Sequence, residues 1–234
     1  MAEPEEIAQR IEALMSGSKR LRGQRWLVTA GPTYEKIDAV RFIGNYSSGK
    51  MGFALATALA EAGAEVDLVT GPTSLDVPLH QSITLHRVES AREMYAAATA
   101  AWPQCHGAIL SAAVADYRPA EQADHKLKKQ GNEGMTLHLV QNPDILATLG
   151  STKREGQVLV GFALETDHEM QNAEGKLKRK NLDYIVLNSL RDAGAGFGVD
   201  TNKVTILASD GNHKALPLAS KGEIARQIVE TVAP

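Results

Sequence analysis

Short runs of apolar residues alternate along the chain with longer segments in which apolar residues recur every three or four positions. Short runs rich in β-branched residues predict buried strands, and the longer periodic segments predict helices. The first two runs stop at Gly-Pro, a dipeptide that ends regular structure. The predicted strands lie within residues 25–33, where the strand ends in a turn from Thr29 to Thr33, and within 65–72, 83–88, 107–116 and 158–163. The predicted helices span residues 48–62, with Gly63 at the carboxyl end, and 91–101.

Strands and helices alternate in this part of the chain, which favours a parallel sheet with helices on both faces. Right-handed crossovers between such strands give a Rossmann-like, doubly wound arrangement, so the predicted fold class is α/β with a mostly parallel sheet. Ligands of such folds bind at the carboxyl ends of the strands, where the loops TAGPT, AAVAD and GFALET follow their strands. We expect these loops to form one shared site.

The second half of the chain departs from simple alternation. A basic polar stretch, HKLKKQ, precedes residues Met135 to Val140, whose alternating pattern predicts a strand. Residues 202–217 predict a β-hairpin around Asp210 and Gly211. A hairpin and an exposed arm added to an α/β core often serve a partner chain.

The length of 234 residues is enough for one or two domains with a substantial core. Residues 1–23 have the charged pattern of a lead-in helix and linker, so we place the main domain at residues 24–234. With 25 Lys and Arg against 28 Asp and Glu, the chain has no basic excess that would favour nucleic-acid binding. No apolar run approaches the roughly 18–20 residues of a membrane span, and no signal peptide is visible.

Cysteine and histidine chemistry is sparse. The single cysteine, Cys105, leads into an apolar strand and is expected to be a structural thiol rather than a nucleophile. One cysteine excludes an internal disulfide, and a reducing cytoplasm is the expected compartment. The 7 histidines show no zinc-binding spacing, so no protein-held metal site is predicted.

The segment from Gly44 to Lys50 matches the G-x-x-x-x-G-K spacing of a phosphate loop. Position 51 is Met, however, where that motif needs a Ser or Thr hydroxyl for Mg²⁺. A loop of small residues before a helix still favours anions, because backbone N–H groups and the helix dipole point at the ligand. We therefore predict a phosphate or nucleotide site that is not a Walker A motif. A Y-x-x-x-K match at Tyr46 to Lys50 lies inside the loop and is interpreted as coincidence.

Several polar residues near these loops are candidates for chemistry. Arg41 suits bidentate binding of a phosphate or carboxylate, and Asn45 suits orientation of a reacting carbonyl; a solvated Arg and a turn Asn are the alternatives. Asp116 ends an apolar run, where a ribose contact and a turn role are equally compatible with the sequence. Two groups of lysines could bind phosphate or simply be solvated: Lys126, Lys128 and Lys129, and the pair Lys176 and Lys180, four apart on a predicted helix.

Six blocks of sequence, in order and at matching spacing, resemble one family, the phosphopantothenate–cysteine ligases of coenzyme A biosynthesis. The resemblance covers residues 24–232 and rests on VTAGPTYEKIDAVRFIGNYSSGKMG, SAAVADYRP, KLKKQ, QNPDIL, VGFALET and KLKRKNLDYIVLN. It implies a two-step reaction: 4′-phosphopantothenate attacks CTP to form an acyl-cytidylate and pyrophosphate, and L-cysteine then captures the acyl group and releases CMP. It also implies Mg²⁺, which neutralises the triphosphate.

The resemblance assigns expected roles to residues that match the family's blocks. Asn45 and Arg41 are expected to act in capture of the acyl-cytidylate, and Lys126 in its formation. The expected nucleotide-binding residues are Leu110, Ser111, Ala112, Asp116, Lys126, Pro143, Asp144, Ile145, Leu146, Phe162, Lys176 and Lys180, and the expected phosphate and substrate loop includes Gly31, Ser47, Ser48 and Gly49. Gly44 and Gln141 depart from the commonest family pattern, where Ser and Lys are frequent, which affects fine substrate contacts only.

The resemblance further implies a homodimer, to which the arm contributes. The amino-terminal residues MAEPEEI resemble the junction after a flavin-dependent decarboxylase domain, so such a domain is expected upstream in the native polypeptide. No FMN binding and no decarboxylation are expected of residues 1–234 themselves. Two other functions remain open at this point: an NAD(P)-dependent oxidoreductase, against which the long strand-to-helix connection argues, and a non-catalytic nucleotide-binding module. CTP is favoured over ATP, but base recognition by backbone groups leaves no sequence signal.

Overall fold

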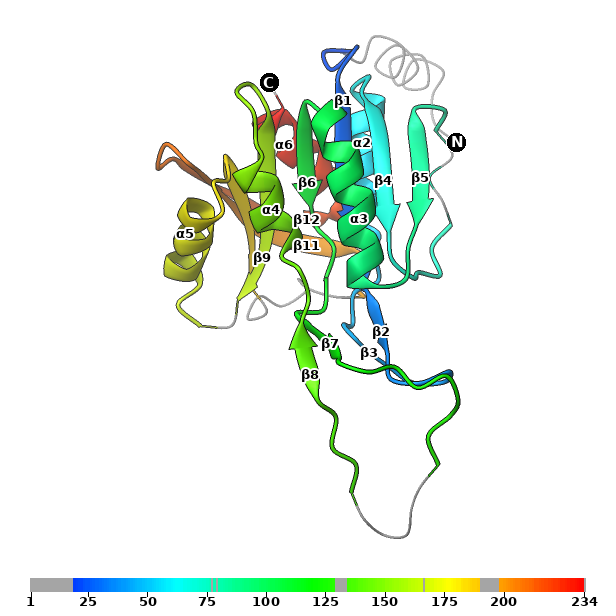
Figure 1. Cartoon of the computed structure of the whole chain (residues 1–234). Helices are drawn as coiled ribbons and strands as arrows, with labels where there is room; N and C mark the ends of the chain where they lie inside the picture. Colours follow the sequence, from blue (N-terminus) through cyan, green and yellow to red (C-terminus); the bar gives the residue numbers. More distant parts are fainter. Residues whose placement is uncertain are drawn as a thin grey trace, which may run out of the picture.

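An eight-stranded sheet forms the centre of the computed structural model, which describes residues 19–76, 78, 80–128, 134–165, 167–189 and 198–233 (Figure 1). The strand order is β12-β11-β10-β9-β6-β1-β4-β5. The strands are β1 (Arg25–Ala30), β4 (Glu65–Thr70), β5 (Ile83–Arg87), β6 (Gly107–Leu110), β9 (Val158–Glu165), β10 (Tyr184–Ser189), β11 (Thr201–Ala208) and β12 (His213–Ser220).

Six strands, from β5 across to β10, pair in parallel, and β11 and β12 are added antiparallel. Numbered along the chain, the parallel strands follow the Rossmann order 3-2-1-4-5-6. The predicted doubly wound α/β fold is confirmed. The predicted hairpin is confirmed as β11 and β12, and Gly211 takes a positive φ of 91° in the turn between them.

Helices cover both faces of the sheet. On one face, α2 (Lys50–Glu61) and α6 (Lys221–Val232) bury Leu55, Leu59 and Ile228 against the strands. On the other face, α3 (Ala91–Ala101), α4 (Ile145–Ser151) and α5 (Glu169–Arg179) form a second apolar cluster and lie in front in Figure 1. A short 3₁₀ helix, Trp102–Gln104, follows α3. The change of face between α2, after β1, and α4, after β6, places the topological switch point between these two strands.

Helix α2 confirms the predicted helix over 48–62 closely. Ala62 is its carboxyl-terminal cap, and Gly63 follows with a φ of +99°. The N–H of Gly63 donates to Ala60 and the N–H of Ala64 donates to Leu59, which together form a Schellman motif. Gly63 therefore stops the helix as expected, because a glycine adopts this left-handed conformation without strain.

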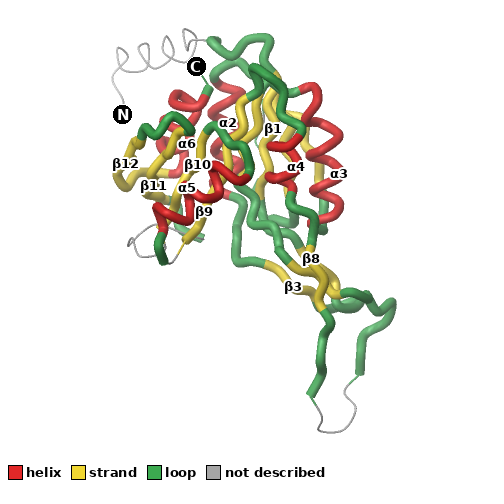
Figure 2. The backbone as a smooth tube through the Cα atoms, turned by 60° about the vertical axis from the view of Figure 1, so that its left-hand side comes forward, coloured by secondary structure: helices red, strands yellow, loops and turns green. Residues whose placement is uncertain are grey.

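Two short hairpins extend from the carboxyl-terminal edge of the sheet and were not predicted. One pairs β2 (Tyr34–Lys36) with β3 (Phe42–Gly44), where the rings of Tyr34 and Phe42 stack with centroids 3.9 Å apart. The other pairs β7 (Tyr117–Pro119) with β8 (Leu139–Gln141). Figure 2 shows that the chain between β7 and β8 projects far from the sheet, and we call residues 120–138 the arm, of which 129–133 are outside the described residues.

Two predicted strands were too long. Only residues 107–110 of the expected strand 107–116 join the sheet, because residues 111–115 bond to Thr29 near the end of β1 and to the loop that follows it. Of the expected strand Met135 to Val140, only the last two residues lie in a strand, because β8 pairs with β7 over three residues.

The amino-terminal part of the described chain belongs to the core, contrary to expectation. Leu21 is fully buried within the cluster under α2, and its N–H donates to Ala62. Residues 1–18 of the predicted lead-in helix lie outside the described residues. Across the part of the chain that is described, the helices are all too short or too polar to cross a membrane.

Candidate active site

A cavity of about 560 Å³ opens at the carboxyl ends of the parallel strands, at the switch point between β1 and β6. Its walls come from the start of α2, the loop after β6, the start of α4, the end of β9 and one face of α5. Most of the residues expected at the nucleotide line it: Leu110, Ser111, Ala112, Asp116, Pro143, Asp144, Ile145, Leu146, Phe162, Lys176 and Lys180, together with Ser47, Ser48 and Gly49.

Hydrogen bonds join the loops after β1 and β6 into one wall. The hydroxyl of Ser111 donates to the carbonyl of Thr29 at 2.8 Å, and the N–H of Ala115 donates to the hydroxyl of Thr33 at 2.9 Å. The N–H of Ala113 donates to the carbonyl of Gly31 at 2.9 Å. Gly31, which was expected in the phosphate loop, does not line the cavity; its φ of 75° lies in the left-handed region that favours glycine, and a Cβ there would lie 3.3 Å from the carbonyl oxygen of Gly71, after β4.

The start of α2 is open to the cavity. The N-cap is Gly49, with a φ of 84°, and no side chain caps the helix and no acidic residue lies in its first turn. The first N–H groups of a helix and its dipole favour an anion, and the small residues Ser47 and Ser48 leave room for one. Met51, in the position where a Walker A motif has a hydroxyl, lies in the first turn of α2.

Lys176 on α5 and Lys180 at the end of α5 line the cavity, and each is paired with a carboxylate. Lys176 Nζ lies 2.6 Å from Glu165 Oε1, and Lys180 Nζ lies 2.7 Å from Asp144 Oδ2. Asp144 also caps α4, because its side chain accepts from the N–H of Ala147 at 2.9 Å. Burial raises the pKa of Asp144, but the hydrogen bonds from Lys180 and Ala147 outweigh burial and hold the pKa below its usual value.

Sequence reasoning missed the polar residues at the far end of the cavity. Lys50, Asn188, Asn202 and Lys221 come from α2, β10, β11 and α6 and all line it. Asn202 is 1% exposed, and its amide donates to the side-chain oxygen of Asn188 at 3.2 Å. Burial, and then the charge of Lys50, lower the pKa of Lys221. Two ammonium groups and two amides so placed suit a ligand that carries several anionic oxygens.

The three residues expected to act in catalysis do not line this cavity. Asn45 lies at its rim, where its amide donates to the carbonyl of Ala113 at 3.0 Å. Arg41 pairs with Asp38 on the β2–β3 hairpin, and Lys126 is exposed on the arm. The expected assembly of Arg41, Asn45 and Lys126 with the nucleotide-binding residues is therefore absent from the described part of a single chain.

The residues around the cavity do not form a metal site of their own. Across residues that the structure describes, no cluster of three His, Cys, Asp or Glu side chains is found. Mg²⁺ is commonly held by one or two carboxylates together with substrate phosphates, and Asp116 and Asp144 are the carboxylates at the cavity. This donor set fits a metal ion that arrives with a nucleotide.

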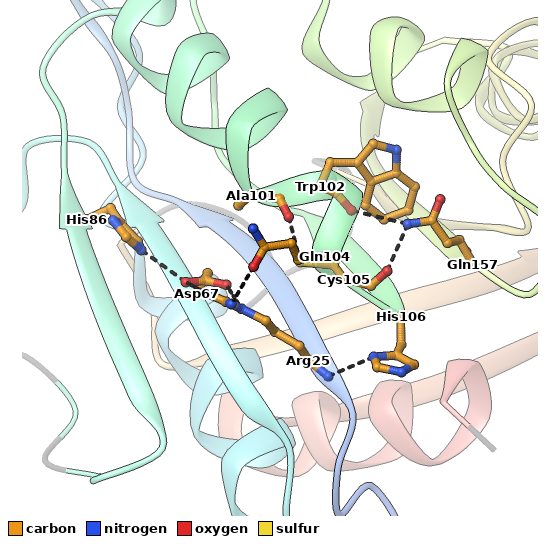
Figure 3. A network of polar contacts seen from close by, with 9 residues as sticks. All are labelled: Arg25, Asp67, His86, Ala101, Trp102, Gln104, Cys105, His106 and Gln157. Carbon is orange, nitrogen blue, oxygen red and sulfur yellow. Dashed lines mark hydrogen bonds and ion pairs between the residues drawn. The ribbon is translucent and has the colours of Figure 1, made fainter.

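Cys105 lies just before β6, at the end of the sheet opposite the cavity, in the network drawn in Figure 3. It is 2% exposed, and burial raises the pKa of its thiol to about 12. The prediction of a structural thiol is confirmed, because a nucleophilic cysteine needs a lowered pKa and access to substrate.

The Rossmann order, the open start of α2 and the lysines of the cavity define an α/β protein with a cavity suited to an anionic ligand. Residues 21–234 match the model of the family described as DNA/pantothenate metabolism flavoprotein C-terminal domain, and the chain belongs to this family. The family membership is evidence against an NAD(P)-dependent oxidoreductase.

Relatives with the same domain are longer proteins. A coenzyme A biosynthesis bifunctional protein CoaBC of Bacillus subtilis is 45% identical over all of this chain, which covers 57% of that protein. The corresponding protein of Escherichia coli is 41% identical over 99% of this chain and is also covered to 57%. A protein named cysteine/cysteine sulfinic acid decarboxylase, from an unknown prokaryotic organism, is 51% identical over 99% of this chain and covered to 65%. The chain thus spans less than two thirds of the length of these curated relatives.

Solved structures share the fold. The C-terminal domain of a coenzyme A biosynthesis bifunctional protein CoaBC has a TM-score of 0.77 and 44% identity, with 92% of this chain and 96% of that chain covered. A Cab2 variant in complex with phosphopantothenate-cysteine has a TM-score of 0.73 at 18% identity, over 99% of this chain and 92% of that chain. At that identity, the second structure supports the fold alone.

Proposed function

We propose that this chain is a phosphopantothenate–cysteine ligase domain, which joins 4′-phosphopantothenate to L-cysteine through an acyl-cytidylate. The observation that carries the proposal is the 44% identity to the C-terminal domain of a CoaBC protein, which this chain covers almost completely at 96%. The cavity is consistent with this chemistry, because it combines an anion-binding helix start with lysines on its opposite wall.

In the first half-reaction, the cavity binds CTP. Lys176 and Lys180 exchange their carboxylate partners for phosphate oxygens and offset the charge of the triphosphate. The open N–H groups of α2 donate to phosphate oxygens, and Phe162 offers an aromatic face at the end of β9. Mg²⁺, carried by the nucleotide, would be held near Asp116 and would neutralise the triphosphate when bound. The carboxylate of 4′-phosphopantothenate then displaces pyrophosphate.

In the second half-reaction, the amine of cysteine attacks the acyl carbon and CMP leaves. Asn45 is placed at the rim to orient the acyl group, since its amide already donates to a carbonyl of the cavity wall. Arg41 serves the same step, and Lys126 serves formation of the intermediate.

A homodimer is part of the proposal. Large apolar side chains are exposed on the hairpins, on the arm and in the loop before α2, and exposed apolar patches of this kind mark protein interfaces. They are Val40, Phe42, Tyr46, Tyr117, Leu127, Met135 and Leu139. Association through this surface would give Arg41 and Lys126, which lie outside the cavity of their own chain, a place at a substrate. Light scattering at several protein concentrations measures the mass directly, and a monomer throughout would contradict this part.

The proposal includes a cytoplasmic setting and a flavin-dependent decarboxylase upstream in the native polypeptide, as in a bifunctional CoaBC protein. The decarboxylase named for the 51% identical relative is a different activity and is tested separately.

The deciding experiment measures pyrophosphate release by the purified chain with Mg²⁺ and 4′-phosphopantothenate, with CTP or ATP, and with or without cysteine. We expect release with CTP, and CMP together with phosphopantothenoylcysteine when cysteine is added. Asn45→Ala should still release pyrophosphate but transfer the acyl group poorly. If neither nucleotide supports release while CTP still binds, the chain is a binding module. Carbon dioxide release from cysteine or phosphopantothenoylcysteine would instead indicate the decarboxylase.

A further inference from the structure

Asp38 is a buried carboxylate in the turn of the β2–β3 hairpin. It is 1% exposed, and each of its oxygens accepts from a separate set of donors. Oδ1 accepts from the N–H groups of Val40 and Arg41, each at 2.8 Å, which shapes the turn. Oδ2 accepts from the guanidinium of Arg41, at 3.0 Å from Nε and 2.5 Å from Nη2, and from the N–H of Leu127 at 3.1 Å.

The second oxygen therefore joins the turn of the β2–β3 hairpin to Leu127 of the arm, which is distant from it in sequence. The same Nη2 of Arg41 donates to the carbonyl of Leu127 at 2.8 Å, so both backbone groups of Leu127 are held. The N–H of Ala123 donates to the carbonyl of Ile37 at 3.0 Å, a second link between arm and hairpin. Lys126 immediately precedes the residue that is held.

The charge of Asp38 is part of this arrangement. The hydrogen bonds from Arg41 hold the pKa of Asp38 well below its usual range, so the carboxylate is ionised at any pH at which the enzyme is assayed. An ionised carboxylate offers lone pairs to all the donors around it, whereas a neutral amide of the same shape offers an oxygen on one side only.

We propose that Asp38 is a positioning residue that fixes Arg41 and the backbone beside Lys126 with one carboxylate oxygen. This inference rests on the proposed ligase function, in which Lys126 serves formation of the acyl-cytidylate and Arg41 serves its capture. A single buried group thereby sets the geometry of both half-reactions, although it touches no substrate.

The substitution Asp38→Asn separates this role from general support of the fold. With its oxygen in the place of Oδ1, the amide keeps the bonds to the N–H groups of Val40 and Arg41. Its NH₂ group then faces the guanidinium of Arg41 and the N–H of Leu127, both of which are donors, so those bonds are lost. The hairpin turn remains while the link to the arm breaks.

Glu35→Gln is the matched control. Glu35 lies on the same hairpin, is 3% exposed, and its Oε1 accepts from the N–H of Ala91 at the start of α3 at 2.9 Å. It anchors the hairpin to the body of the protein, and it forms no hydrogen bond with the described residues of the arm. Both substitutions turn a buried carboxylate of one hairpin into an amide, so a shared effect reports folding and a difference reports the link to the arm.

The first readout is activity, resolved into half-reactions. We expect Asp38→Asn to lower the turnover rates of both pyrophosphate release and cysteine capture by about tenfold or more, as expected for a lost charge-assisted hydrogen bond. Glu35→Gln should change both by less than about twofold. In an Arg41→Gln background, Asp38→Asn should lower capture no further but should still slow pyrophosphate release. The proposal would be overturned if Asp38→Asn and Glu35→Gln changed the turnover rates equally. It would also be overturned if the effects of Asp38→Asn and Arg41→Gln on cysteine capture were fully additive.

The second readout does not depend on activity. Trypsin cleaves after lysine, and the peptide bond after Lys126 is held by both backbone groups of Leu127. Mass spectrometry of timed digests should show faster cleavage after Lys126 in Asp38→Asn than in the unsubstituted protein, with no such change in Glu35→Gln. Unchanged cleavage would overturn the inference even if activity fell. If the protein has no ligase activity but its cleavage changes as expected, the proposed function is refuted, while the link between Asp38 and the arm stands.

Discussion

The side-chain nitrogen of Lys180 lies 2.7 Å from a carboxylate oxygen of Asp144, the residue that caps α4 at the wall of the cavity. This lysine is thus charge-paired, and it lines the cavity. A phosphate that replaces the carboxylate gains an ammonium already close to its position, and Asp144 retains the N–H of Ala147 as a donor.

We therefore expect Lys180→Gln to weaken CTP binding by about tenfold, since a hydrogen bond to a charged group contributes roughly 1.5–3 kcal/mol and part is offset by the loss of the Asp144 pair. Isothermal titration with Mg²⁺ and CTP measures the change directly. Lys153→Gln is the control, because Lys153 pairs with Asp183 at 3.0 Å and does not line the cavity. Equal affinities of the two variants would contradict a phosphate role for Lys180.

Gly52, in the first turn of α2, is expected to tolerate no side chain. A Cβ at this position would lie 2.5 Å from the Cβ of Ala30 and 2.8 Å from the hydroxyl of Ser111. Alanine favours a helix by roughly 1 kcal/mol over glycine, but overpacking costs about 1–3 kcal/mol. Gly52→Ala should therefore destabilise the protein by about 1 kcal/mol and weaken CTP binding, because α2 must move away from β1 and the cavity wall.

Gly222 supplies the opposite case in the first turn of α6. A Cβ there would meet nothing within 4 Å, so Gly222→Ala should stabilise the protein by about 0.5–1 kcal/mol. Urea unfolding of both variants measures the two signs in one experiment. Stabilisation by Gly52→Ala would show that α2 does not pack on β1 as closely as described.

The strands and helices of the first half were predictable because their apolar patterns are long and end at Gly-Pro or at a capping glycine. The β2–β3 and β7–β8 hairpins were not, because three-residue strands carry no periodicity that distinguishes them from loops.

The residues at the two ends of the cavity also differ in how well the sequence predicts them. Its phosphate loop is one continuous stretch of sequence and was found from its motif. The segment 143–146 is another continuous stretch and was found from a block of the family resemblance. Asn202 and Lys221 reach the cavity only after β11 and α6 have packed, and no local pattern marks either residue. Arg41 and Lys126 show the converse, since the motifs found them but a single chain does not bring them to the cavity.

Cys105 should be unreactive in the folded protein. Its thiol is buried and donates to the carbonyl of Ala101 at 3.4 Å, and its pKa is raised to about 12. At pH 8, a thiol reagent such as dithionitrobenzoate should react at least ~100-fold more slowly with the native protein than with the protein in urea. Cys105→Ala should retain ligase activity. Rapid native labelling, or loss of activity in that folded variant, would contradict a structural role.

Asp67 should make stability depend on pH at the edge of the sheet opposite the cavity (Figure 3). Its carboxylate is 1% exposed and receives Arg25 Nε at 2.6 Å and Nη2 at 3.0 Å, with His86 Nε2 at 3.1 Å. Burial raises the pKa of Asp67, but the hydrogen bonds from Arg25 and His86 outweigh burial, so the folded-state pKa lies below its usual value. Arg25 remains partly exposed and can be solvated alone, so we expect Asp67→Asn to cost about 2 kcal/mol of unfolding free energy at pH 7.

The sign of the pH dependence follows from the lowered pKa. The ionised pair contributes its full stabilisation above the unfolded-state pKa of about 4, and the contribution is lost as pH falls through the lower folded-state pKa. The difference in stability between the unsubstituted protein and Asp67→Asn should therefore shrink as the pH falls below about 4. Urea unfolding is the measurement, because guanidinium chloride would screen the pair. Glu155→Gln, at an exposed turn, should stay within about 0.5 kcal/mol throughout. A difference that grows as the pH falls below about 4 would mean that the folded-state pKa of Asp67 is raised and that its pairing with Arg25 is not what stabilises this end of the sheet.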